Sequence, residues 1–220
     1  MKKKSALAQT TFYVGVTFFA VVVLAIAAIV VAQVAQRYTL TDPNDSSVRL
    51  TAGPIVCTGV HLGKGEILTA AHCLAQLEIA SMIYGELKYK VETGLGLLDT
   101  EVLWSAPEYD VALLHAPALR TKAATLSCNS LVIGERIFTT GNPLGYHRIT
   151  TEGRVAGNMA ASKDFKEYQL VDLTVAPGNS GGPVFNIKGS FVGIVVAIVP
   201  PFNFTFIVPS PTLCKLLGRG

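Results

Sequence analysis

Residues 176–183 are Ala176-Pro177-Gly178-Asn179-Ser180-Gly181-Gly182-Pro183, a run that surrounds one serine with turn-forming residues. Glycine lets the backbone turn sharply, so amide N–H groups in such a run can converge on one point. There they can stabilise an oxyanion, an effect worth roughly 3–4 kcal/mol per donor. A serine hydroxyl is a poor nucleophile at neutral pH unless a base takes its proton. The run therefore predicts a reactive serine, provided that the chain supplies a base.

Two earlier segments supply that base and a partner for it. The first is Thr69-Ala70-Ala71-His72-Cys73, and the second spans residues 107–114 with Asp110 near its centre. An imidazole titrates near neutral pH, so His72 can accept a proton and later return it. A buried carboxylate can hold the imidazole in the tautomer that this exchange requires. His72, Asp110 and Ser180 are therefore the candidate catalytic residues.

The body of the chain consists of short runs rich in Val, Ile, Leu and Thr, separated by Gly, Pro, Asn and Asp. About a dozen such runs predict an all-β barrel or sandwich. A polar stretch near residues 117–130 divides them into two sets of about six and is the expected lobe boundary. Helices are expected only as a turn over 71–76 and a short C-terminal helix over 212–217. The expected strands are 55–60, 66–70, 80–84, 87–92, 97–104, 111–114, 136–140, 148–156, 167–173, 184–187, 191–199 and 204–208.

The N-terminal segment differs from the rest, because residues 12–35 are almost wholly apolar. A helix of this length reaches about 36 Å, enough to cross a hydrocarbon core of about 30 Å. The lysines before it favour a cytoplasmic N-terminus, so we expect a single-pass membrane anchor and an extracytoplasmic domain. The alternative is a cleaved signal peptide, which would export the same domain. Residues 1–36 are the expected anchor, 37–47 a tether and 48–217 the folded domain.

Charge and residue spacing exclude several classes of function. The formal net charge is +3, and Lys2, Lys3 and Lys4 account for it, because the rest of the chain carries equal numbers of basic and acidic residues. A neutral body without a basic run is not expected to bind nucleic acid. The cysteines and histidines show no CxxC or HxxxH spacing, so we expect neither a metal site nor a cofactor.

The three candidate residues lie in motifs that closely resemble the signatures of trypsin/chymotrypsin-like serine proteases: His72 in TAAHC, Asp110 in YDVALL and Ser180 in GNSGGP. Their order along the chain is that of this family and differs from the order in subtilisins and α/β-hydrolases. The resemblance covers about residues 48–217. It implies two packed six-stranded antiparallel β-barrels with the site between them, in agreement with the number of expected strands.

The resemblance also implies a role for each residue. His72 would be the general base, Asp110 its orienting partner and Ser180 the nucleophile, while the N–H groups of Gly178 and Ser180 would form the oxyanion hole. Digestive trypsins carry an aspartate immediately before the nucleophile, which pairs with a freshly cut N-terminus. This chain has Asn179 at that position, so activation by a new N-terminus is not expected.

Within the family, the sequence is similar to the HtrA/DegP-like branch. Three segments carry this likeness: residues 171–184, Gly141-Asn142-Pro143-Leu144-Gly145 with leucine where an aromatic is usual, and Ile207-Val208-Pro209-Ser210. HtrA proteins usually continue into a PDZ domain, whereas this sequence ends at Gly220. Regulation through such a domain and trimer formation are therefore not carried over, and the oligomeric state stays open.

The same resemblance indicates a specificity pocket. Trypsins that cut after Lys or Arg have a carboxylate six residues before the nucleophile, and Thr174 stands there in this chain. The pocket walls of the family follow the nucleophile by about 15 to 25 residues, which points to Val195, Val196, Ala197 and Thr205. These residues are small or apolar, so we expect a preference for small or medium aliphatic side chains.

Four cysteines, Cys57, Cys73, Cys128 and Cys214, suit an exported domain with disulfides and permit three pairings. The separation of Cys57 and Cys73 is similar to that of the trypsin-family disulfide that pins the histidine loop. A link between Cys128 and Cys214 resembles one found in some trypsins. The resemblance therefore implies these two pairs.

Together these features predict an exported, membrane-tethered serine endopeptidase that acts on protein or peptide substrates, including unfolded segments. Two alternatives stay open at this point. One is a processing protease with a narrow target, such as a viral, phage or membrane-signal enzyme. The other is a pseudoprotease that binds without cleaving, although all three candidate catalytic side chains are present.

Overall fold

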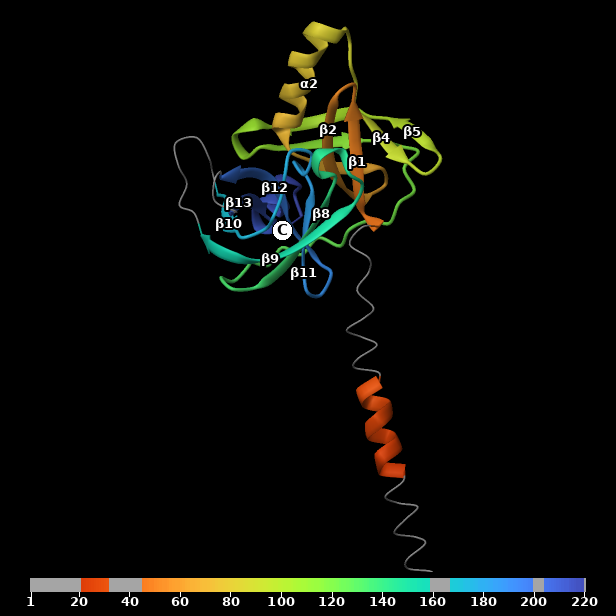
Figure 1. Cartoon of the computed structure of the whole chain (residues 1–220), viewed down its shortest axis with the longest axis vertical. Coiled ribbons are helices and arrows are strands. Elements are labelled where there is room, and N and C mark those ends of the chain that lie inside the picture. Colours follow the sequence, from red (N-terminus) through yellow and green to blue (C-terminus); the bar gives the residue numbers. More distant parts are fainter. Residues whose placement is uncertain (1–20, 32–44, 159–166, 200–203, 220) are drawn as a thin grey trace, which may run out of the picture. The chain divides into compact units, whose positions relative to one another are not determined.

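The computed structural model describes residues 21–31, 45–158, 167–199 and 204–219. By their contacts, residues 1–40 and residues 41–220 form two separate compact units. In the first unit, residues 21–31 are helical and belong to the apolar segment of the sequence (Figure 1). Within the described residues, every helix is too short or too polar to cross a bilayer. The remainder of the expected anchor lies outside the described residues.

The N-terminal half of the second unit is one open antiparallel sheet of seven strands. Its strand order is β5-β4-β1-β2-β3-β7-β6, so β5 and β6 form the two edges. The strands are β1 (Ser47–Ala52), β2 (Ile55–Gly63), β3 (Glu66–Thr69), β4 (Lys90–Thr93), β5 (Gly96–Asp99), β6 (Glu101–Ala106) and β7 (Val111–His115).

The C-terminal half is a closed antiparallel barrel of six strands, in the order β10-β13-β12-β11-β8-β9. A closed barrel has no free edges, because its first and last strands, β10 and β9, pair with each other. The strands are β8 (Arg136–Gly141), β9 (Ile149–Asn158), β10 (Gln169–Val171), β11 (Pro183–Asn186), β12 (Phe191–Val199) and β13 (Phe204–Pro209). Helix α3 (Ser210–Leu216) follows β13, as the sequence predicted for the C-terminus.

The prediction of two six-stranded barrels is therefore correct for the second lobe and wrong for the first. The run 97–104, expected as one strand, is broken at Thr100, whose hydroxyl donates a hydrogen bond to the Tyr89 carbonyl at 2.7 Å. The two pieces, β5 and β6, pair with β4 and β7 at opposite edges of the sheet. In addition, β1 was not predicted, although the alternation of polar and apolar side chains over Ser47–Ala52 is the pattern of a half-buried strand.

Helix α2 (Ala71–Tyr84) is the second departure from expectation, since the sequence predicted one turn followed by a strand over 80–84. Apolar residues occur around the whole helix, so the sequence has no stripe at helical spacing that would have identified it. Only Ala71, Cys73 and Ala80 are buried. Figure 1 shows that α2 projects from the sheet, and its last turns expose large side chains, including Met82 and Ile83.

Two clusters of buried apolar residues hold this unit together. The larger includes Leu50 and Leu114 from the sheet and Phe191 and Val208 from the barrel, so it spans the boundary between the lobes. The smaller lies within the barrel and contains Ile137, Val171 and Ile207, among others. Burying a side chain of this size contributes about 1.5–3 kcal/mol, so the shared cluster fixes one lobe against the other.

Two 3-10 turns and one long connection complete the unit. The turns are η2 (Pro107–Tyr109), just before β7, and η3 (Pro143–Gly145), just after β8. The connection between β7 and β8 covers residues 116–135 and belongs to no named strand, although Leu126 forms an isolated β-bridge with Phe191. The expected lobe boundary at 117–130 falls within it.

His61 of β2 is buried within this fold, and both of its ring nitrogens have backbone partners. Nδ1 lies 2.9 Å from the Thr121 carbonyl oxygen, and Nε2 accepts the Gly65 N–H at 3.3 Å. A neutral ring with the proton on Nδ1 satisfies both contacts, whereas a protonated ring cannot accept from Gly65. Burial of the ring lowers the pKa of His61 below its ordinary value of 6.5.

This shift predicts an acid-sensitive fold. Because the unfolded chain binds a proton below about pH 6.5 and the folded His61 resists it, stability falls as the pH drops from 6.5 towards the lowered pKa. We expect His61→Gln to lose less free energy of unfolding than the wild type between pH 7.5 and 5.5, measured by urea unfolding. Equal losses in both proteins would contradict this role of His61.

Candidate functional site

His72 lies in the first turn of α2. The helix has no side-chain cap of its own at Ala70. Instead, the backbone N–H of His72 donates to Asp110 Oδ1 at 2.7 Å. An unpaired N–H in the first turn of a helix is thereby satisfied, and its partner is the same residue that contacts the imidazole.

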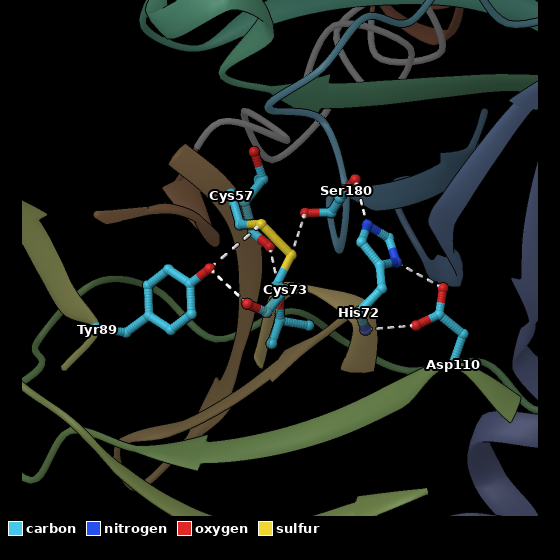
Figure 2. A network of polar contacts seen from close by, with 8 residues as sticks. Cys57, His72, Cys73, Tyr89, Asp110 and Ser180 are labelled. Atoms are coloured by element: carbon cyan, nitrogen blue, oxygen red, sulfur yellow. Dashed lines mark hydrogen bonds and ion pairs between the residues drawn. A yellow bond between two sulfur atoms is a disulfide. The ribbon is translucent and has the colours of Figure 1, made fainter. Parts of the chain in front are cut away.

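Asp110 makes that second contact through its other oxygen. Oδ2 lies 2.7 Å from His72 Nδ1, so the carboxylate holds the histidine at both its backbone and its ring (Figure 2). Asp110 ends the η2 turn in the left-handed region, with φ of 54°. Asp is one of the few non-glycine residues that adopt this conformation with little strain, which accounts for its position at the turn before β7.

Ser180 completes the group from the other lobe. Its Oγ lies 2.8 Å from His72 Nε2, on the opposite side of the ring from Asp110 (Figure 2). The structure therefore brings His72 into contact with two residues that are distant along the chain, Asp110 at 38 positions and Ser180 at 108 positions. A carboxylate on Nδ1 places the proton there, which leaves Nε2 free to accept the serine proton.

Hydrogen bonds hold most of the backbone of residues 176–182, which we call the serine loop. Three of its amides donate to carbonyls: Asn179 N to Ala176 O at 3.0 Å, Gly181 N to Val195 O at 2.7 Å and Gly182 N to Asn179 O at 2.8 Å. The amides of Gly178 and Ser180 have no backbone acceptor among the described residues. Buried amides are nearly always paired, so these two are the amides left for a ligand.

The loop also requires glycine at two positions. Gly178 has φ of 103°, and a Cβ there would lie 2.3 Å from the Asn142 carbonyl oxygen. Gly181 has φ of 78°, and its Cβ would lie 2.2 Å from Thr69 Oγ1. Any side chain at either position would collide with the neighbouring segment and strain the backbone.

A cleft of about 600 Å³ opens beside Ser180 and Gly178. Val195, Val196 and Ala197 line it, and its described lining contains no charged residue. Thr174 and Thr205 do not line it. Thr205 is buried in the barrel, where its hydroxyl donates to the Leu173 carbonyl at 2.8 Å. The cleft is lined by residues 54–57, Gln76, Leu144, Gly145, 175–178, Ser180 and 195–198.

A second cleft of about 820 Å³ lies on the other side of the imidazole, between α2 and β6. Its lining includes His72, Asp110 and Tyr168 together with apolar side chains of α2. Burial raises the pKa of Tyr168, and the negative charge of Asp110 raises it further. The tyrosine therefore presents a neutral hydroxyl to this cleft, which Asp110 also lines.

Two disulfides reinforce this arrangement. Cys57 pairs with Cys73, so β2 is joined covalently to α2 one residue beyond His72 (Figure 2). The Tyr89 hydroxyl donates to the Cys73 carbonyl at 2.9 Å and supports the same turn. Cys128 pairs with Cys214, which ties the connection between the lobes to α3. Loops of these lengths correspond to roughly 3 and 4–5 kcal/mol in the chain-entropy account of disulfides.

The family assignment rests on a match to the trypsin-like peptidase domain over residues 57–194, more than half of the chain. The chain belongs to this family. Its relatives include a probable periplasmic DegP-like serine endoprotease of Ectopseudomonas mendocina, 32% identical over 133 residues, and one of Brucella suis, 30% identical over 131 residues. These matches cover 59% and 56% of this chain. The chain spans about a quarter of the length of these relatives, 26% in both cases.

Solved structures show the same fold. The active form of the Rv3671c protease from M. tuberculosis has a TM-score of 0.71 at 18% identity, covering 83% of this chain and 84% of that one. The HtrA-type protease AlgW with a tripeptide also has a TM-score of 0.71, at 20% identity, covering 84% of this chain and 62% of that one. The similarity to the HtrA/DegP-like branch predicted from the sequence is confirmed by these relatives and neighbours.

Sequence reasoning missed several residues around the candidate site. Thr58, Asn142 and Tyr168 are all buried and lie beside the candidate side chains or the serine loop. None of them belongs to a motif with a chemical signature of its own. The turn around Asn142 was noticed for its likeness to the HtrA branch, but its contact with the serine loop depends on folding.

Proposed function

We propose that this chain is a serine endopeptidase that uses Ser180 as nucleophile, His72 as general base and Asp110 as the residue that orients His72. The observation that carries the proposal is the continuous chain of contacts from Asp110 Oδ2 through the imidazole to Ser180 Oγ, at 2.7 and 2.8 Å. Membership of the trypsin-like peptidase family supports it independently.

The geometry suits acyl transfer in two steps. His72 Nε2 takes the Ser180 proton while Oγ bonds to the substrate carbonyl carbon, and the carbonyl electrons move to oxygen. As the tetrahedral species collapses, the peptide C–N bond breaks and His72 gives its proton to the leaving amine. Water then loses a proton to His72 and attacks the acyl-enzyme, and the Ser180 oxygen leaves with that proton. The unpaired N–H groups of Gly178 and Ser180 are the candidate donors to the oxyanion.

The substrate is proposed to bind as an extended strand along β12. This strand pairs with β13 from Gly193 to Val199, but its pairing with β11 ends at Ile194. Beyond Val195 the other edge of β12 is therefore unpaired within the described residues, beside the cleft that contains Ser180. An exposed strand edge next to a pocket is a common site for an extended peptide.

The uncharged cleft supports a preference for small or medium aliphatic side chains immediately before the scissile bond. A charged substrate side chain would lose its hydration there without gaining an ionic partner. Thr174, six positions before Ser180, is not part of this cleft, so the proposed preference depends on the residues that do line it.

We further propose that the protease domain lies outside the cytoplasm and that residues 12–35 anchor it as a single-pass segment, with 37–47 as the tether. Two disulfides support an oxidising compartment. The DegP-like relatives are named as periplasmic proteases. The length of the apolar segment and the preceding lysines support an anchor over a cleaved signal peptide.

The proposed nucleophile can be tested by labelling with a fluorophosphonate probe and by casein cleavage. We expect the wild type to be labelled and Ser180→Ala to lose both labelling and at least about 10⁴-fold of its activity, because no other group supplies the attacking oxygen. Ser190→Ala, in the turn between β11 and β12, is the control and should keep both. A labelled and active Ser180→Ala, or an unlabelled, inactive but folded wild type, contradicts the proposal.

The proposed specificity can be tested with a peptide library that varies the residue before the scissile bond. We expect kcat/KM for Val, Ala or Leu to exceed that for Lys or Glu by about tenfold or more, because of the desolvation cost. Ala197→Asp should raise the relative rate for Lys, whereas Thr174→Asp, outside the cleft, should not. A wild-type preference for Lys, Arg or Glu, or a gain for Lys in Thr174→Asp, argues against this cleft.

A further inference from the structure

Thr58 of β2 occupies an unusual position, since one fully buried hydroxyl meets both the serine loop and the turn after β8. Its Oγ1 donates to the Gly178 carbonyl at 2.7 Å. The same oxygen accepts from the Asn142 backbone N–H at 3.1 Å and from Asn142 Nδ2 at 3.0 Å. A hydroxyl has one proton and two lone pairs, so the hydrogen-bonding capacity of Thr58 is completely used.

These bonds fix the peptide groups on both sides of Gly178. Thr58 holds the Gly178 carbonyl directly. It also anchors Asn142, which begins the turn whose Leu144 N–H donates to the Pro177 carbonyl at 2.7 Å. In a trans peptide the N–H points opposite to the carbonyl. With the Pro177 carbonyl tied to Leu144, the Gly178 N–H is therefore held in one direction.

The backbone of Thr58 adds a third restraint on the same loop. Its N–H donates to the Ser180 carbonyl at 2.9 Å. Thr58 belongs to the seven-stranded sheet of the first lobe, the lobe in which α2 and the η2 turn carry His72 and Asp110, whereas the serine loop connects two strands of the barrel. The residue therefore ties the loop of one lobe to the framework that carries the base.

We propose that Thr58 is a positioning residue for the oxyanion hole: its hydroxyl, with Asn142, keeps the Gly178 N–H directed at the developing oxyanion. The inference rests on the proposed serine endopeptidase function. Thr58 is not proposed to contact the substrate. Its hydroxyl is proposed to act through Gly178 on the stability of the transition state. Loss of the hydroxyl should lower kcat more than it raises KM, because a misdirected donor weakens only the binding of the charged state.

The test compares Thr58→Val, which keeps the shape and removes the hydroxyl, with Thr58→Ser, which keeps the hydroxyl. In the full chain, with a peptide amide substrate, we expect Thr58→Val to lower kcat roughly 10–100-fold, up to the effect of losing one oxyanion donor. KM should change less than about threefold, and Thr58→Ser should retain kcat within about threefold. The rate of fluorophosphonate labelling should fall in parallel with kcat, since that reaction also develops charge on an oxygen held at the same site.

Thr139→Val is the matched control for buried hydroxyls in general. Thr139 is fully buried in β8, and its Oγ1 donates to the Pro183 carbonyl at 2.9 Å, three residues beyond the nucleophile. This variant should lose thermal stability comparable to that of Thr58→Val while keeping kcat. A purely structural role for Thr58 predicts that both variants behave alike.

Asn142→Ala serves as a second variant, because it removes one donor to Thr58 and leaves the Thr58–Gly178 bond. We expect a smaller fall in kcat, about 3–10-fold, again with little change in KM. An unchanged kcat in folded Thr58→Val, or in Asn142→Ala if Thr58→Val cannot be recovered folded, overturns the inference. A fall in kcat matched by Thr139→Val overturns it as well. An inactive, unlabelled wild type would instead refute the proposed function.

Discussion

Buried backbone groups must find hydrogen-bond partners, and in the serine loop this requirement decides where the reactive groups point. The carbonyls of Pro177, Gly178, Asn179 and Ser180 all accept hydrogen bonds from defined donors. With the carbonyls fixed, the orientation of the intervening amides follows. Two N–H groups then remain without a backbone acceptor in the described part of the chain, and they flank the nucleophile.

The proposed catalytic arrangement also depends on the joining of two unlike lobes. The lobe with the open sheet supplies His72 from α2 and Asp110 from the η2 turn, and the lobe with the closed barrel supplies Ser180 from the loop before β11. A shared apolar cluster fixes the lobes against one another, and hydrogen bonds from Thr58 refine their alignment at the loop itself. A shift of even 1 Å between His72 Nε2 and Ser180 Oγ would break their 2.8 Å contact. Proton transfer between these atoms therefore requires that the interface between the lobes be held precisely.

Much of the site could be predicted from the sequence, because the constraints there are local. His72, Asp110 and Ser180 each lie in a motif whose neighbours serve the turn, the helix start or the glycine conformations. The strands of the closed barrel were also largely predicted, since their apolar runs are long and bounded by turn residues. Helix α2 was not, because its apolar residues surround the helix and most of them face solvent.

The residues that sequence reasoning misplaced or missed depend on contacts between distant segments. Counting from the nucleophile placed Thr205 in the pocket, but its side chain is buried within the barrel, where it bonds to Leu173. Thr58 meets partners 84 and 120 positions away, and a single threonine after a cysteine carries no signal of that.

The oxyanion hole is tested most directly by a crystal structure of the protein with a phosphonyl group on Ser180. We expect the phosphonyl oxygen to lie about 2.7–3.1 Å from the N atoms of both Gly178 and Ser180. The Thr58 hydroxyl should still contact the Gly178 carbonyl. A phosphonyl oxygen directed to solvent, or a peptide group turned so that the Gly178 N–H points away from it, would contradict an oxyanion hole at these two amides.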